Sequence, residues 1–196
     1  MTIQVGHLYR HGNIDYSIVS STNPFPFDPK DYGIVPFPRC TACHRGYWCC
    51  YTAVDNQFVL DDLFINTQDD IYPSICGITA TVEDNRAMYM NHHIYRRLHI
   101  PIDYTGKLLV GRNAIPTYYV DGIFNDPWKY KDLKELIFEN GLLVDMIEQS
   151  DTAKDIRKLV QAMAKTRPKA TGIMGTYVQV ELGALKLISN NAWWIA

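Results

Sequence analysis

The residues with the greatest capacity for chemistry lie between Cys40 and Cys50, in a stretch that reads C-T-A-C-H-R-G-Y-W-C-C and holds four of the five cysteines. Cys40, Cys43, His44 and Cys49 offer thiolate and imidazole groups, which are the ligands that zinc prefers. No second C-x-x-C follows, however, and adjacent residues of a strand, such as Cys49 and Cys50, point to opposite faces. The pattern therefore favours buried, inert thiols and no cofactor, with a zinc-stabilised module as the alternative.

The same motif, Cys40-x-x-Cys43-His44, matches the spacing used for covalent haem attachment. That chemistry takes place outside the cytoplasm, and the N-terminal sequence has no signal-peptide pattern. A redox C-x-x-C normally opens a helix, whose dipole lowers the pKa of the thiol, whereas R-G-Y-W after His44 is typical of entry into a strand. We therefore expect neither haem binding nor catalytic redox chemistry.

A small enzyme remains open, because a cysteine nucleophile and its histidine base often meet only in the fold. The candidate catalytic residues of such a hydrolase or transferase are Cys43, His44 and His99. The sequence contains neither a glycine-rich nucleotide-binding loop nor a G-x-S-x-G elbow. The acidic pairs Asp61-Asp62 and Asp69-Asp70 lack the spacing of an EF-hand loop, so we expect them at solvated hairpin ends.

Aromatic residues are abundant, with 13 Tyr, 4 Trp and 7 Phe. Tyrosine and tryptophan are frequent at binding hot spots, because they bury a large area at little cost in rotamer entropy. Cores rich in strands use aromatic residues as well, so both explanations stay open. The residues predicted to form a binding surface are Tyr118, Tyr119, Trp128, Tyr130, Trp193 and Trp194.

Composition places the chain among globular proteins, since 47% of its 196 residues are hydrophobic and 20% are charged. We expect residues 1–196 to form a single domain. The net charge of −2 and the dispersed basic residues argue against nucleic acid as a partner. No apolar run approaches the roughly 18 residues of a membrane span. The expected location is the cytoplasm, where the thiols stay reduced.

Turn signals predict a mainly antiparallel sheet of hairpins. Gly12-Asn13 joins the first two strands, Asp55-Asn56 follows the central strand at 47–54, and Asn140-Gly141 joins the last hairpin. Between the first hairpin and the central strand, five prolines from Pro24 to Pro38 predict an extended surface crossing.

Two segments carry apolar residues at helical spacing, 83–98 and 151–166. Residues 117–123 and 175–188 are further strand candidates, from their β-branched and alternating residues. The expected fold is α+β, a mainly antiparallel sheet of hairpins with the two helices packed on one face.

Four segments, T-A-C-H-R-G-Y-W-C, Y-P-S-I-C-G, Y-T-G-K-L-L-V-G and D-P-W-K-Y, together resemble a group of small bacterial hypothetical proteins. The resemblance spans residues 32–157 and implies no activity and no functional residue. Missing catalytic motifs and many aromatic residues lead us to expect a non-enzymatic protein-binding module. Its partner would be another protein, as for a bacterial immunity or antiphage component. The alternatives are a small enzyme with a Cys/His site near the central strand and the zinc-stabilised module.

Overall fold

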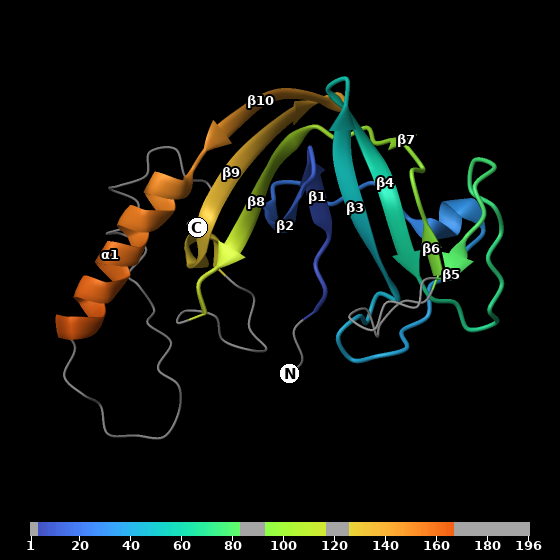
Figure 1. The fold of residues 1–196 in the computed structure, drawn as a ribbon, viewed down its shortest axis with the longest axis horizontal. Helices are drawn as coiled ribbons and strands as arrows, with labels where there is room; N and C mark the ends of the chain where they lie inside the picture. The colour runs from blue at the N-terminus through green and yellow to red at the C-terminus, as the bar shows by residue number, and fades with distance from the viewer. Residues whose placement is uncertain (1–3, 83–92, 117–125, 167–196) are drawn as a thin grey trace.

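The computed structural model describes residues 4–82, 93–116 and 126–166. Within them, ten strands form one strongly arched sheet (Figure 1), in the spatial order β10-β9-β8-β2-β1-β3-β4-β6-β5, with β7 also paired to β4. The strands are β1 (Leu8–His11), β2 (Ile14–Ser21), β3 (Tyr47–Val54), β4 (Gln57–Ile65), β5 (Thr81–Val82), β6 (His93–Tyr95), β7 (Ile100–Pro101), β8 (Gly106–Ala114), β9 (Tyr130–Glu139) and β10 (Leu142–Glu148). The described helices are the 3-10 turns η1 (Pro29–Tyr32) and η3 (Pro127–Lys129) and the α-helix α1 (Ser150–Thr166).

The prediction of a largely antiparallel sheet is confirmed, with one correction. β1 runs parallel to β3, with Leu8 opposite Cys50 and Tyr9 opposite Tyr51, so the sheet is mixed. A parallel pair needs a long connection. The proline-rich segment between β2 and β3 supplies it, and this segment crosses the surface as expected, with η1 as its one described helical turn.

The tips of two hairpins meet at the top of the arch (Figure 1). The turn residues Asn56 and Gly141 both have positive φ, of 65° and 77°, as the turn signals predicted. Phe58 N–H donates to Gly141 O at 2.7 Å, and Leu143 N–H donates to Asn56 O at 2.8 Å. A Cβ on Gly141 would lie 2.7 Å from Ile102 O, so this contact requires glycine. The sheet thus closes on itself at this end through β4 and β10.

The main core fills the inner face of the arch. Aromatic rings from the strands pack against Phe25 and Phe27 of the proline-rich segment, and Phe25 stacks on Tyr51 with ring centroids 5.0 Å apart. The largest fully buried side chains of this core are Tyr9, Tyr51, Tyr95, Phe58 and Phe138.

The described part of the chain contains one α-helix where two were predicted. The predicted helix at 83–98 is wrong at its C-terminal end, where His93–Tyr95 forms β6 and pairs with β4. Residues 83–92, like the strand candidates at 117–123 and 175–188, lie outside the described residues. The predicted helix at 151–166 is confirmed as α1, which packs Ala153 and Ile156 on the outer face of β8 and β9.

Candidate functional site

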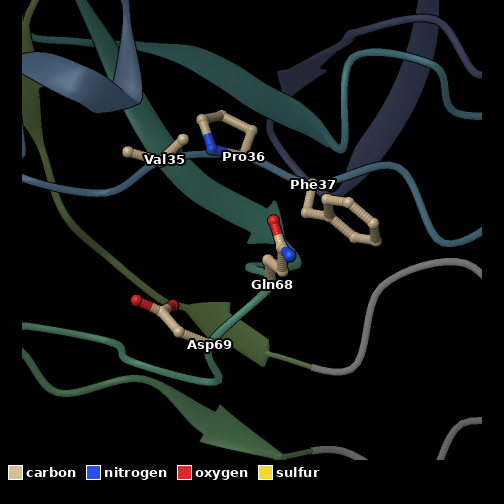
Figure 2. A pocket seen from close by; sticks show the side chains of 5 residues that line it. All are labelled: Val35, Pro36, Phe37, Gln68 and Asp69. Atoms are coloured by element: carbon tan, nitrogen blue, oxygen red, sulfur yellow. The ribbon is translucent and has the colours of Figure 1, made fainter.

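A groove of about 480 Å³ opens at the surface where β4 ends. Residues 35–37 form one side of it, and Gln68 and Asp69 form the other (Figure 2). The Gln68 amide is directed across the groove toward residues 35–37. Segments about 30 residues apart in the sequence therefore make one concave surface.

Backbone contacts hold residues 35–37 against the chain that leaves β4. Pro36 forms an antiparallel bridge with Thr67, and Phe37 N–H donates to Asn66 O at 2.8 Å. Arg39 donates to Thr67 O at 3.0 Å. Gly46, with a φ of 74°, lies so near that a Cβ there would be 2.6 Å from Phe37 N. The groove wall is thus fixed by the backbone of three neighbouring segments.

The groove is lined by the apolar residues Val35, Pro36 and Phe37 and by the polar residues Gln68 and Asp69. Val35 is 68% exposed and Phe37 39% exposed, and nearby Ile71 is 62% exposed. The Asp69 carboxylate accepts the Ile71 N–H at 3.3 Å, and Asp70 pairs with Arg39. The groove thus offers apolar side chains, one amide and one carboxylate for contact. Sequence reasoning missed it, although a run of apolar residues between prolines was a signal that these side chains reach solvent.

The structure places the thiol of Cys43 in a small apolar cluster on the outer face, beside Trp48 and Phe64. Burial raises the pKa of this thiol, partly opposed by the positive charge of Arg45. The thiol donates to Tyr47 O at 3.5 Å. The His44 side chain is exposed, and among the described residues no histidine hydrogen-bonds to the Cys43 sulfur. A Cys43–His44 catalytic pair is therefore not assembled in these parts of the chain.

The proposed zinc ligands are also separated. Cys43 belongs to the outer cluster, whereas Cys49 is buried in the inner core. All five cysteines are free thiols. In the ranges that the structure describes, no three His, Cys, Asp or Glu side chains are placed to hold a metal ion.

The prediction that Asp61 and Asp62 are solvated hairpin ends is wrong. Both residues lie at a bulge within β4 and are only 7% and 2% exposed. Arg10 Nη1 lies 2.8 Å from Asp61 Oδ2 and 3.2 Å from Asp62 Oδ2. Arg96 contacts Asp62 as well, at 2.8 Å. Two buried carboxylates are thus neutralised by arginines from β1 and from the chain after β6.

His99 lies at the edge of this ion-pair network. Its Nε2 is 3.3 Å from Asp61 Oδ1, while its side chain is 54% exposed. Its φ of 47° is unusual for a residue other than glycine, and strained backbone of this kind is concentrated at functional sites. Of the three predicted catalytic residues, His99 is the one whose ring is held by a carboxylate.

The predicted binding aromatics that can be placed serve mainly to pack η3 and α1. Trp128 is half-buried against the cluster that contains Ile156. Tyr130 is buried with its ring over Gly111, where a Cβ would lie 2.6 Å from it. Arg157 donates to the carbonyl oxygens of both aromatic residues at 2.7 Å. Their role in binding stays a prediction, as does that of Tyr118, Tyr119, Trp193 and Trp194, which lie outside the described residues.

Comparison of the chain with protein-family models, with characterised proteins and with solved structures finds no match. No helix in the described ranges is both long enough and apolar enough to cross a membrane. The function must therefore be inferred from the physical character of the surface.

Proposed function

We propose that this protein is a non-enzymatic protein-binding module and that it holds its partner in the groove between residues 35–37 and 68–69. The observation that carries the proposal is the exposure of Val35 and Phe37 on one wall of this concave surface. Apolar side chains left in water at a depression of fixed shape favour association with another apolar surface. Because the groove wall is fixed by backbone contacts, little conformational entropy is lost when a partner binds.

The chemistry of the rim supports a particular kind of partner segment. Asp69 has no ion-pair partner among the described residues, so its carboxylate is available to a lysine or arginine. The expected partner segment presents an apolar side chain to Phe37 and a basic one to Asp69. Electrostatic complementarity of this kind contributes mainly to specificity and association rate.

The cellular setting in this proposal is the cytoplasm, and the role is that of a bacterial immunity or antiphage component that neutralises or senses another protein. Five unpaired cysteines support a reducing compartment. The resemblance to small bacterial proteins supports the bacterial setting.

Selection from a displayed library of short random peptides tests the proposal. We expect the wild-type protein to enrich peptides that combine an apolar residue with Lys or Arg. Their affinity should fall at least about tenfold, or about 1.4 kcal/mol, for Phe37→Ala and for Asp69→Lys. Val144→Lys is the matched control, because Val144 is also exposed but lies on β10, away from the groove. Failure to enrich any peptide, or equal affinity for all three variants, overturns the proposal.

The alternative of a small hydrolase or transferase has one observation in its favour, the contact between exposed His99 and Asp61. An aspartate can orient an imidazole as a general base. A panel of chromogenic carboxylate and phosphate esters tests this alternative. It predicts turnover that His99→Gln abolishes, while the exposed control His44→Gln retains it. Absence of turnover by the wild-type protein favours the binding module.

A further inference from the structure

Cys40 and Cys43 are joined by a tight turn. Cys43 N–H donates to Cys40 O at 3.3 Å, with Thr41 and Ala42 at the corner of the turn. A turn of this kind keeps its first and fourth Cα atoms within about 7 Å, and disulfides span Cα separations of about 4.4 to 6.8 Å. Cys40 also packs against the outer cluster that contains Cys43. The backbone therefore already holds the two cysteines at a separation that a disulfide can bridge.

We propose that Cys40 and Cys43 form a reversible disulfide when the protein meets a disulfide oxidant such as oxidised glutathione. The two residues differ in access to the oxidant, because Cys40 is partly exposed and Cys43 is buried. Cys40 is thus the first to react, and Cys43 is the resolving thiol. This role is distinct from a catalytic redox centre, since the turn leads into β3 and not into a helix.

The reaction proceeds by two thiol–disulfide exchanges. The Cys40 thiolate attacks one sulfur of oxidised glutathione, which releases one glutathione thiolate and leaves the other glutathione bonded to Cys40. The Cys43 thiol then loses its proton to water, and its sulfur attacks the Cys40 sulfur and releases the second glutathione. Two protein thiols are oxidised to one disulfide, and one glutathione disulfide is reduced to two glutathione thiols.

Electrostatics around Cys43 agree with this order. Burial raises the pKa of the Cys43 thiol, the nearby charge of Arg45 lowers it, and negative charge on Cys40 raises it again. Bonding to glutathione removes the thiolate charge from the Cys40 sulfur, which is the atom that Cys43 then attacks.

The turn also binds the N-terminal segment of the described chain through hydrogen bonds. Four hydrogen bonds join residues 4–5 to residues 41–45: Val5 N–H to Ala42 O at 2.8 Å, the Gln4 side chain to Thr41 O at 2.8 Å, His44 N–H to the Gln4 side chain at 2.9 Å, and Arg45 to Val5 O at 2.6 Å. A disulfide across the turn restrains the atoms that make these contacts. The oxidised protein should therefore hold the N-terminal segment more firmly than the reduced protein.

The test uses the full chain carrying Cys76→Ser, which removes the exposed cysteine that lies outside the pair. The protein is incubated over a series of ratios of oxidised to reduced glutathione and quenched with acid. We expect intact-mass spectrometry to show the loss of two hydrogen atoms, and peptide mapping to place the disulfide between Cys40 and Cys43. Hydrogen exchange at the Val5 amide should be slower in the oxidised protein. Excess reduced glutathione should reverse both changes.

Single variants on the same background separate the steps. Cys43→Ser should accumulate one glutathione on Cys40, because the resolving thiol is missing. Cys40→Ser should remain unmodified, because Cys43 is buried, and since Cys40 is partly exposed this variant should fold. A wild-type pair that keeps glutathione on Cys40 without closing, a disulfide that maps to Cys49 or Cys50, or no reaction at any ratio would overturn the proposal. None of these outcomes depends on the groove or on a binding partner.

Discussion

His7 should make the stability of the protein depend on pH, because its ring is enclosed in the folded chain. The rings of Phe25, Tyr51 and Tyr47 surround it at centroid distances of 5.4, 5.8 and 6.1 Å. Its Nδ1 accepts the Cys49 N–H at 3.0 Å, which requires that this nitrogen carry no proton. Burial, aided by the charge of Arg45, lowers the pKa of His7 from 6.5 to about 3.

The sign and size of the effect follow from proton linkage. Below pH 6.5 the unfolded chain binds a proton at His7, whereas in the folded chain His7 stays neutral down to about pH 3. The contribution of His7 to stability is therefore complete above pH 6.5 and falls as the pH drops toward 3. Between about pH 7.5 and pH 5 the loss amounts to about 2 kcal/mol. This figure is an upper limit, because part of the residue remains accessible to water, which screens the charge.

Urea unfolding of the wild-type protein and of His7→Gln, at about pH 7.5 and pH 5, measures this contribution. Glutamine can accept the Cys49 N–H but cannot gain a proton. We expect the wild-type protein to lose up to about 2 kcal/mol more than the variant on acidification, because the other titrating groups are common to both. His44→Gln, which replaces an exposed histidine, should behave as the wild type. An equal pH dependence of wild type and His7→Gln would show that His7 is not held neutral by the fold.

Three further outcomes are expected. Arg10→Met should lower the free energy of unfolding by about 2 to 3 kcal/mol in urea titration, because it leaves the buried carboxylate of Asp62 with one ion-pair partner fewer. Asp15→Asn removes a charge at the exposed side of the same network and should lower it by less than about 1 kcal/mol. Gly111→Val should lower the melting temperature by several degrees, at a cost of about 1 to 3 kcal/mol, since its Cβ meets the Tyr130 ring at 2.6 Å. A chelator should leave the melting temperature unchanged, and a sharp fall would instead favour the zinc-stabilised module.

The hairpins could be predicted from the sequence because their turns depend on local chemistry. Asn56 and Gly141 adopt positive φ in tight turns, and residues of these types favour that conformation whatever the rest of the fold does. The helix α1 was predictable for a similar reason, since its apolar spacing is contained within one segment. These elements are encoded in a few neighbouring residues.

The misplaced elements depend on contacts far along the chain. His93–Tyr95 has helical spacing with its neighbours, but pairing with Leu63 and Phe64 of β4 makes it a strand. The sequence predicts that Asp62 is solvated, because its partner Arg10 lies 52 residues away and only the fold brings the two together. Propensity and spacing contain no information on such partners, and tertiary pairing overrides them.

The groove illustrates the same limit for function. The sequence predicts that Val35 and Phe37 belong to an extended surface crossing and that Asp69 belongs to a solvated acidic pair. The bridge between Pro36 and Thr67 turns these separate features into one concave surface. The residues were visible in the sequence, but their proximity was not.

The contact between the two hairpin tips also has a consequence for synthesis of the chain. Gln57 and Gly141 are 84 residues apart, so the partner of β4 at this end leaves the ribosome long after β4 itself. At about 5 to 20 residues per second, the delay is roughly 4 to 17 s. Throughout that interval the nascent chain exposes the Gln57 end of β4 and incompletely covered rings of Phe58 and Tyr51, the kind of surface that chaperones bind. Translation rate over the region between the two hairpins should therefore influence how much of the protein folds correctly.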